Sequence, residues 1–282
     1  MIKKPLILIT TGDPKGIGKE VTAKSLKDPR IKGLADFIVI DPSDATGLSA
    51  IKKALSILKL GKAQALVTAP VNKSKINNSG TLFQGHTEFL AKSTNTKRFA
   101  MFFCSEKLKV TTVTRHIPLK DVPKAIRKKR TVEDAILLTH KALKENFRIS
   151  KPRIGVAGLN PHAGEMGTVG LEEKEILEPL LKKLRSKNLD LKGPLPGDVV
   201  FHLAYTGKLD VVIAMYHDQA LAPFKMIAFK DGVNVTLGLP FIRTSPDHGT
   251  AYDIAGKGIA DPSSMKEAIK LAAYMCKDSK HA

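Results

Sequence analysis

The stretch LILITTGDPKGIG, residues 6–18, decides the fold class. It opens with a short apolar run, Leu6–Thr10, and then breaks into Gly-Asp-Pro followed by two more glycines. A short run that is apolar throughout is typical of a strand buried on both faces of a sheet, and glycines mark the turn behind it. The stretch therefore predicts a buried first strand that leads into a tight loop.

Further apolar runs of strand length recur along the chain, at Phe37–Ile40, Ala65–Thr68, Val110–Thr114, Ile154–Ala157 and Val211–Met215. Segments with a helical period lie between or after them, most clearly at Leu48–Leu60, Val132–Phe147, Leu171–Leu184 and Met265–Cys276. Apolar strands that alternate with helices predict an α/β fold of three layers, with mostly parallel sheets covered on both faces.

Length and composition indicate a globular enzyme-sized protein. The 282 residues suffice for one large α/β domain or two smaller ones, and 43% are hydrophobic and 26% charged. No apolar run approaches the roughly 20 residues that span a bilayer. Cys104 and Cys276 suggest neither a zinc ribbon nor a disulfide framework. We expect a cytoplasmic protein that does not bind membranes.

The net charge of +19 raises the alternative of nucleic-acid binding. However, the lysines are scattered along the expected helices, and the sequence has no basic tail and no nucleic-acid-binding motif. A lysine-rich solvated surface explains the charge better, and part of it can attract anionic substrates.

Polar motifs follow most of the expected strands: TGDPKGIG, TAPVNKS, TRHIPL, GLNPHAGE and YHDQ. In parallel sheets, ligands gather beyond the carboxyl ends of the strands. The densest group of titratable residues lies in 214–262, a segment expected to lack ordinary helix or strand. This distribution predicts an active site that handles an anionic substrate.

Three of these motifs place a histidine just past a strand, at His116, His162 and His217. One such histidine is more often structural, but three at one edge of a sheet favour a divalent metal site with room for a substrate oxygen. Asp218 lies next to His217 and is suited to orient its ring.

Other polar groups are suited to anions. Lys225, Asn234 and Arg243 supply a cation, an amide and a planar guanidinium near Gly- and Pro-rich turns. His86 and Thr87 lie at an expected helix start, which indicates either an anion site or an ordinary threonine N-cap. Two readings also remain open for the glycines of TGDPKGIG: a phosphate loop or simple turn geometry.

Taken together, the motifs identify a family. TTGDPKGIGKE, TAPVNKSKIN, GHTEFLA, TRHIPLKDV, GLNPHAGEMG, AMYHDQALAPFK and GVNVTLGLPFIRTSPDHGTAYDIAGKG closely resemble 4-hydroxythreonine-4-phosphate dehydrogenases of vitamin B6 biosynthesis, in family order over nearly the whole chain. The stretch SPDHGTAYDIAGKGIADP is also similar to the dinucleotide-binding loop of the wider isocitrate and isopropylmalate dehydrogenase superfamily.

The resemblance implies an isocitrate dehydrogenase-like catalytic unit over 1–282, with subdomains of about 1–110 plus 240–282 and about 111–239 flanking a cleft. It implies a homodimer with shared active sites. A divalent metal (zinc, magnesium or cobalt) would be held by His116 and His162 of one chain and His217 of the partner subunit.

The implied reaction is oxidation of 4-phosphooxy-L-threonine by NAD or NADP to a β-keto acid, which decarboxylates to 3-amino-2-oxopropyl phosphate. Close relatives oxidise threonate or erythronate 4-phosphate instead, and the sequence leaves the substrate, the nucleotide and the metal open. Lys225 is our candidate for proton transfer or phosphate contact, with Asp198, Asp218 and Asp247 as rival bases. The implied substrate contacts are His86, Thr87, Lys225, Asn234 and Arg243, and the implied nucleotide contacts are His248, Gly249 and Asp253.

One region departs from the family pattern. Members usually carry a longer excursion between the second strand and the next helix, whereas VIDPSDATGLSAIKKAL closes this gap within a few residues, 41–47. Either a peripheral hairpin has been lost or the sequence omits part of it. None of the candidate site residues falls there.

Overall fold

A computed structural model describes residues 4–128 and 130–277. The chain forms two compact units, the first made of Met1–Lys97 and Lys230–Ala282, the second of Arg98–Phe229. The boundaries expected from the sequence, near 110 and 239, lie further along the chain than these. Within the described residues, no helix has the length and apolar character needed to cross a membrane.

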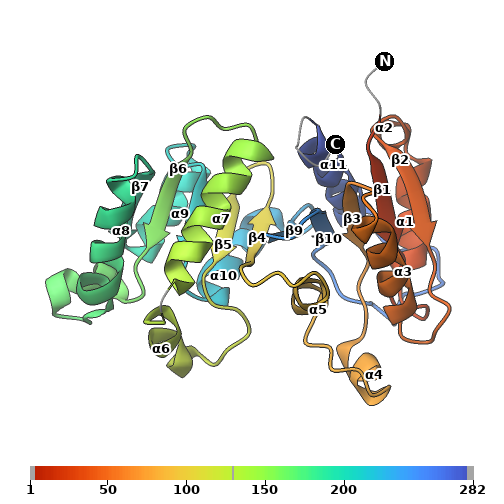
Figure 1. Cartoon of the computed structure of the whole chain (residues 1–282), viewed down its shortest axis with the longest axis horizontal. Helices are drawn as coiled ribbons and strands as arrows, with labels where there is room; N and C mark the ends of the chain where they lie inside the picture. The colour runs from red at the N-terminus through yellow and green to blue at the C-terminus, as the bar shows by residue number, and fades with distance from the viewer. Residues whose placement is uncertain (1–3, 129, 278–282) are drawn as a thin grey trace. The chain divides into compact units, whose positions relative to one another are not determined.

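The first unit is built on five strands in the order β2-β1-β3-β10-β9. Neighbours from β2 to β10 run parallel, and β9 is antiparallel to β10. Helix α3 covers one face of this sheet, and α1, α2 and α11 pack together on the other (Figure 1). The strands are β1 (Leu6–Thr10), β2 (Asp36–Ile40), β3 (Ala65–Thr68), β9 (Val233–Leu237) and β10 (Ile242–Pro246). The helices are α1 (Gly18–Lys27), α2 (Pro29–Lys32), α3 (Leu48–Lys59), α4 (Lys73–Asn78), α5 (His86–Ser93) and α11 (Ser263–Cys276).

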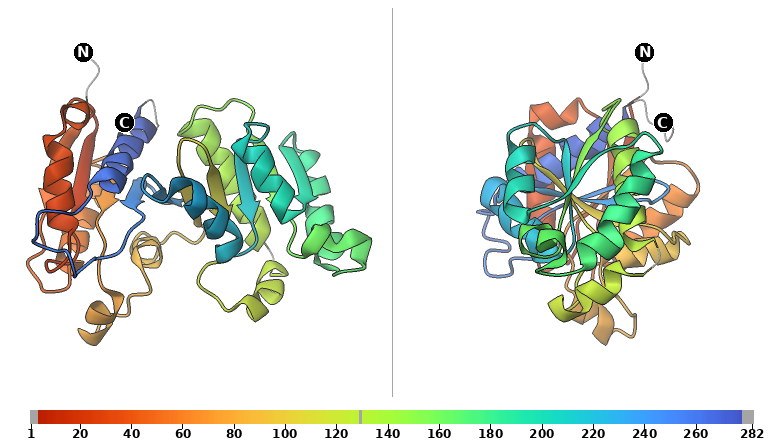
Figure 2. Two further views of the ribbon diagram at one scale, coloured as in Figure 1. Left: turned by 180° about the vertical axis from the view of Figure 1, so that it is seen from behind. Right: turned by 90° about the vertical axis from the view of Figure 1, so that its left-hand side faces the viewer.

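The second unit has the strand order β4-β5-β8-β6-β7. β4 is antiparallel to β5, and the other neighbours run parallel. Helix α7 lies on one face and α9 and α10 on the other, as the opposite views in Figures 1 and 2 show. The strands are β4 (Ala100–Cys104), β5 (Lys109–Thr112), β6 (Arg153–Ala157), β7 (Asp190–Leu195) and β8 (Val211–Ala214). The helical segments are η1 (Leu119–Asp121), α6 (Val122–Ile126), α7 (Thr131–Glu145), η2 (Pro161–Gly167), η3 (Glu173–Leu177), α8 (Glu178–Arg185), α9 (Gly197–Tyr205) and α10 (His217–Ala228).

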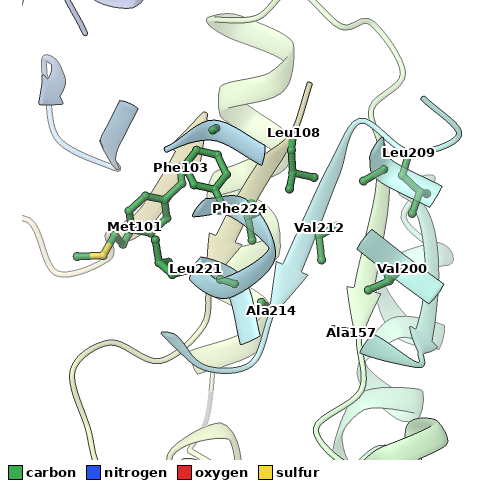
Figure 3. Close-up of a cluster of buried hydrophobic side chains, with 14 residues drawn as sticks. Met101, Phe103, Leu108, Ala157, Val200, Leu209, Val212, Ala214, Leu221 and Phe224 are labelled. Atoms are coloured by element: carbon green, nitrogen blue, oxygen red, sulfur yellow. The ribbon is translucent and has the colours of Figure 1, made fainter. Parts of the chain in front are cut away.

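An apolar core fixes α10 against the second sheet (Figure 3). Phe224 of α10 packs on Phe103 of β4, with ring centroids 5.7 Å apart. The buried residues of α10 recur at the helical spacing that turns one face toward a sheet: Ala220, Leu221, Phe224 and Ala228. This packing holds the first residue of α10, His217, at the carboxyl end of β8.

The structure confirms the predicted fold class: mostly parallel strands with helices on both sides. All six expected strands are present: β1 and β3 have the expected bounds, and the ends of the other four differ by one or two residues. The sequence pattern missed β4, β7, β9 and β10. The expectation that 214–262 lacks regular elements was wrong, because this segment contains α10, β9 and β10. Pro223 inside α10 and the short strands between glycines and prolines hid these elements.

Side-chain hydrogen bonds close the short connection 41–47. Asp44 closes it by accepting hydrogen bonds from the backbone N–H groups of Gly47 and Ser49 and from the Ser49 hydroxyl, at 3.1, 3.3 and 2.7 Å. Gly47 has a φ of 86°, and a Cβ there would lie 2.6 Å from the Gly12 carbonyl oxygen. The connection therefore packs directly against the loop that follows β1.

Candidate active site

The carboxyl ends of β5 and β8 bring two of the predicted metal ligands together. Backbone pairing continues past both strands, with Val113 N–H donating to Ala214 O at 2.8 Å and Thr114 N–H to Met215 O at 3.2 Å. As a result, the rings of His116 and His217 lie with centroids 5.4 Å apart and planes tilted by 46°. Both histidines belong to the same chain, a pairing that the family resemblance did not imply.

Asp218 lies against the His217 ring, as its position in the sequence suggested. Its Oδ1 is 2.6 Å from His217 Nδ1. A carboxylate on one ring nitrogen favours the N–H there and leaves the lone pair on the other, Nε2, for a metal. The Asp218 side chain is otherwise exposed.

His162 lies on the segment Pro161–Gly167 after β6. Its backbone is left-handed, with φ of 51°, and its ring nitrogen Nδ1 is hydrogen-bonded to Glu165. Left-handed backbone is unfavourable for residues other than glycine and needs support from surrounding contacts. His162 is exposed and makes no described contact with His116 or His217.

Glu173 supplies the support for this segment, and the sequence analysis missed it. Its carboxylate is almost fully buried and accepts hydrogen bonds from Leu159 N–H at 2.7 Å and Asn160 N–H at 2.8 Å. The Asn160 side chain donates a further bond to it at 2.9 Å. A buried carboxylate with this many donors holds the chain just before His162 in place.

Gln219 connects the loops after β6 and β8. Its Oε1 accepts from Met215 N–H at 2.6 Å, and its Nε2 donates to Gly158 O at 2.7 Å. The amide thus links the turn that carries His217 to the segment that leads into His162. The YHDQ motif contained this residue, but its role becomes visible only once the two loops are adjacent.

The histidine pair fits a metal ion. With a metal–nitrogen distance of about 2.1 Å and tetrahedral angles, two ligating imidazoles have centroids about 5 Å apart, close to the observed 5.4 Å. Across residues 4–128 and 130–277, however, no group of three histidine, cysteine, aspartate or glutamate side chains converges as a metal site. The three-histidine site therefore remains a prediction, supported by two of its members.

The first unit contains a buried cation with uncharged partners. Arg243 of β10 is 3% exposed. It donates to the Thr68 hydroxyl at 2.7 Å, to the Thr236 hydroxyl at 3.2 Å and to Asn234 Oδ1 at 3.4 Å. Its Nε is buried without a hydrogen-bond partner. Burial lowers the pKa of Arg243 from 12.5 to about 10, with the Glu88 charge acting in the opposite direction.

His86 and Thr87 begin helix α5 beside this group. Thr87 does not cap the helix: Gly85 holds the N-cap position, and the Thr87 hydroxyl is hydrogen-bonded to the Thr236 hydroxyl at 3.0 Å. The ordinary N-cap explanation for Thr87 is therefore wrong. His86 Nε2 is buried without a partner. Burial lowers the pKa of His86 well below 6.5, and the charges of Arg243 and Lys73 add to this shift.

The other candidate groups are more dispersed. Lys225 lies two helical turns beyond His217 in α10, about 12 Å along the helix axis, with Nζ 5.4 Å from the centre of the Phe229 ring. Asp198 is exposed in the first turn of α9. Asp247 belongs to the first unit, where its backbone N–H donates to the Ser264 hydroxyl at 3.0 Å. Of the carboxylate candidates, only Asp218 is in described contact with one of the three histidines.

The implied nucleotide contacts lie on the loop after β10. His248 Nδ1 is 2.9 Å from the Gly249 carbonyl oxygen, and its Nε2 is buried without a partner. Gly249 and Asp253 are exposed. The same loop contacts the start of α1, where Ile17 N–H donates to Thr250 O at 3.0 Å.

Close backbone packing accounts for the glycines of TGDPKGIG. A Cβ at Gly12 would lie 2.2 Å from Pro70 O, one at Gly16 2.9 Å from Thr250 O, and one at Gly18 2.1 Å from Thr11 O. Backbone atoms, which cannot move aside easily, fill the space that a side chain would need at each of these positions. Turn and packing geometry thus explains the motif.

Comparison with known proteins identifies the family. The family model described as pyridoxal phosphate biosynthetic protein PdxA matches residues 38–272 of this chain. A 4-hydroxythreonine-4-phosphate dehydrogenase of Roseobacter denitrificans is 50% identical over 95% of this chain and 88% of its own length. A D-threonate 4-phosphate dehydrogenase of Pectobacterium atrosepticum is 39% identical over 95% and 97%.

Solved structures agree with this result. The crystal structure of 4-hydroxythreonine-4-phosphate dehydrogenase from Klebsiella pneumoniae has a TM-score of 0.84 and 37% identity, covering 96% of this chain and 98% of that one. Isocitrate dehydrogenase from Methylococcus capsulatus, 13% identical with a TM-score of 0.51, shares the fold alone. The chain belongs to the PdxA family of pyridoxal phosphate biosynthetic proteins.

Proposed function

We propose that this protein is a metal-dependent dehydrogenase that uses NAD or NADP to oxidise 4-phosphooxy-L-threonine. The product is a β-keto acid, which loses carbon dioxide to give 3-amino-2-oxopropyl phosphate for pyridoxal phosphate biosynthesis. The names of the relatives support a dehydrogenase. The observation that carries the proposal furthest is the buried guanidinium of Arg243, whose hydrogen-bond acceptors are all uncharged.

A buried charge whose hydrogen-bond acceptors are all uncharged costs free energy, and the Glu88 charge offsets only part of that cost, since the pKa of Arg243 is still lowered. Folded proteins rarely keep such a charge for packing alone. Arg243 Nε and His86 Nε2 are both buried polar atoms without a partner, and the two side chains belong to one group in the first unit. An anionic group of the substrate that accepts hydrogen bonds there would satisfy the guanidinium and offset its burial. The site therefore fits a substrate with a phosphate or a carboxylate.

The proposed reaction has two steps, an oxidation and a decarboxylation. The substrate 3-hydroxyl loses its proton to a base, and hydride leaves C3 for the nicotinamide. The bond between the carboxyl carbon and C2 then breaks, carbon dioxide leaves, and the electron pair is protonated at C2. We assign the anionic ends of the substrate to Arg243, His86, Thr87, Asn234 and Lys225.

The His116–His217 pair, together with His162, would hold the divalent metal, which would supply Lewis acidity at the substrate hydroxyl when bound. Asp218 orients His217 through the hydrogen bond at Nδ1. Lys225 lies two turns further along α10, a separation that favours contact with the far end of the substrate over proton transfer at the hydroxyl. We further propose that a second copy of the chain completes the site, as in a homodimer.

Oxidation of a sugar-acid phosphate is the second candidate, because a D-threonate 4-phosphate dehydrogenase matches nearly the whole chain. The two substrates share the phosphate, the carboxylate and the reacting hydroxyl, and they differ in an amino group versus a hydroxyl at C2. Nucleic-acid binding has no comparable support, since the relatives are named as dehydrogenases.

The test is a panel of steady-state assays with metal-depleted protein, to which zinc, magnesium or cobalt is returned. Formation of reduced nicotinamide is followed with NAD or NADP and with 4-phosphooxy-L-threonine, D-threonate 4-phosphate or D-erythronate 4-phosphate. We expect the highest kcat/KM for phosphooxy-threonine, and no turnover before metal is returned. A higher kcat/KM for a sugar-acid phosphate would select the second candidate, and no turnover with any combination would refute both.

A further inference from the structure

The buried residue Asp13 forms the centre of a polar cluster that none of the preceding roles uses. It follows β1 in the TGDPKGIG motif and is 1% exposed. Its Oδ1 accepts from Lys15 N–H at 2.9 Å, and its Oδ2 accepts from Lys75 Nζ at 3.0 Å and from the Tyr252 hydroxyl at 2.5 Å. Three separate segments of the first unit thus meet on one carboxylate.

The Asp13 carboxylate stays charged although it is buried. Burial alone would raise the pKa of Asp13, but the hydrogen bonds from Tyr252, the Lys15 backbone and Lys75 outweigh it and lower the pKa. Lys75 also lies 4.5 Å from the centre of the Tyr252 ring, within range of a cation–π interaction. Asp13 is therefore ionised near neutral pH, and its hydrogen bonds to Lys75 and Tyr252 are charge-assisted.

Tyr252 belongs to the loop that carries the implied nucleotide contacts His248, Gly249 and Asp253. The backbone just before it is unfavourable, since Ala251 has a φ of 46°. The loop has no regular structure of its own between β10 and α11. Its shape must consequently come from contacts with the rest of the first unit.

Helix α1 and the turn before it supply those contacts. Ile17 N–H donates to Thr250 O at 3.0 Å, and the Lys24 ammonium donates to the carbonyl oxygens of Gly258 and Ala260, both at 2.8 Å. Side chains hold the loop at two further points: Asp247 N–H donates to the Ser264 hydroxyl beside His248, and the Tyr252 hydroxyl donates to Asp13 beside Asp253.

We infer that Asp13 is a positioning residue that sets the affinity for the dinucleotide by anchoring the 247–258 loop through the Tyr252 hydroxyl. The inference rests on the proposed function, because it requires that this loop bind NAD or NADP. Asp13 itself touches neither the nucleotide nor the reacting atoms in this account. Asp13 affects only the fraction of molecules in which the loop holds the binding conformation. The apparent Kd rises as this fraction falls.

The test uses Tyr252→Phe, which removes the hydroxyl but keeps the ring over Lys75, and Asp13→Asn, which removes the charge. Tyr205→Phe and Asp36→Asn are matched controls, on an exposed tyrosine of the second unit and an exposed aspartate of β2. Calorimetry gives the Kd for NAD or NADP, and steady-state kinetics give kcat and both KM values. The melting temperature of each variant reports on folding.

We expect Tyr252→Phe to raise the Kd and the KM for the dinucleotide roughly tenfold, typical of losing one charge-assisted hydrogen bond. The KM for the phosphorylated substrate should stay within about twofold, and both controls should behave as wild type. The double variant should bind no more weakly than Asp13→Asn alone, because both changes break the same contact.

Equal dinucleotide Kd values for wild type and Tyr252→Phe would overturn the inference. So would a loss spread evenly over both KM values and kcat, which is the signature of general misfolding. If the wild-type protein itself binds neither NAD nor NADP, the proposed function fails instead, so the two failures are distinguishable. Should Asp13→Asn not fold, Tyr252→Phe alone decides the question.

Discussion

Replacing Arg243 separates a substrate-binding role from a structural one. The first predicts a loss of kcat/KM at nearly unchanged stability, and the second predicts a loss of stability at unchanged kcat/KM. At neutral pH the guanidinium is charged although burial lowers its pKa from 12.5 to about 10. This shift corresponds to a cost of roughly 3 kcal/mol for holding the charge in the folded protein. Removing the charge in Arg243→Met recovers that cost.

The variant also loses hydrogen bonds. Those to Thr68 and Thr236, at 2.7 and 3.2 Å, are well formed, whereas the one to Asn234 is long at 3.4 Å. Each lost bond costs about 1 kcal/mol, so the losses and the recovered charge burial nearly cancel. We therefore expect the melting temperature of ligand-free Arg243→Met to stay within a few degrees of wild type.

Substrate use should change much more. Removing one partner of a desolvated charged pair costs about 2–5 kcal/mol, or roughly 30- to 5000-fold in kcat/KM. Arg243→Lys should not restore activity, because lysine lacks the planar fork. The defect should shrink for an analogue without the phosphate or without the carboxylate, and the analogue that shows this identifies the end bound by Arg243.

The assay is steady-state kinetics together with thermal unfolding of the same preparations, with Arg98→Met as an exposed control. Unchanged kcat/KM combined with a large fall in melting temperature would refute the reasoning. Arg243 would then be structural, and the anion site would have to lie elsewhere.

Four further predictions concern pH, packing, metal binding and assembly. Because the pKa of His86 lies below 6.5 in the folded chain, unfolding takes up protons just below that pH. The free energy of unfolding, measured by denaturant titration, should therefore fall as the pH drops. It should fall less steeply in His86→Gln. Gly18→Ala should lower stability by about 2–3 kcal/mol because its Cβ would meet Thr11 O, whereas Gly33→Ala, with open space around it, should not; equal melting temperatures would contradict this. Replacing His116, His162 or His217 with alanine should abolish metal retention without unfolding the chain, and full metal content in any of these variants would remove that residue from the site. The three variants can also be mixed in pairs. When the two replaced histidines come from different subunits of a wild-type site, the mixture should recover roughly a quarter of wild-type turnover. No recovery in any mixture despite proven subunit exchange would place all ligands of a site in one chain.

Much of the fold could be predicted because most of the expected strands are buried on both faces. Ile7, Leu8 and Ile9 of β1 are fully buried, so their pattern is unbroken in the sequence. Strands β9 and β10 escaped prediction because they carry polar residues, among them Asn234 and Arg243, and lie among glycines and prolines. Local pattern cannot distinguish such a strand from a loop.

Some features of the candidate site could likewise be predicted from the sequence, and others could not. The sequence placed His116 and His217 just past buried strands, at the same edge of a sheet. That the two rings meet within one chain depends on β5 and β8 being neighbouring parallel strands, and the strand order is visible only in the structure. The roles of Glu173 and Gln219 could not be predicted, because each depends on which loops become adjacent after folding. Asp13 was visible only as part of a glycine-rich motif, and its contact with Tyr252 spans 239 positions of sequence.

The most direct test of the central claim is the amount of carbon dioxide released per reduced nicotinamide formed. The substrate is 4-phosphooxy-L-threonine labelled at the carboxyl carbon, supplied with metal and with NAD or NADP. Oxidation followed by decarboxylation predicts equal amounts of labelled carbon dioxide and reduced nicotinamide, with both lost together in Arg243→Met. Reduced nicotinamide formed without labelled carbon dioxide, or no reaction with this substrate at all, would contradict the account.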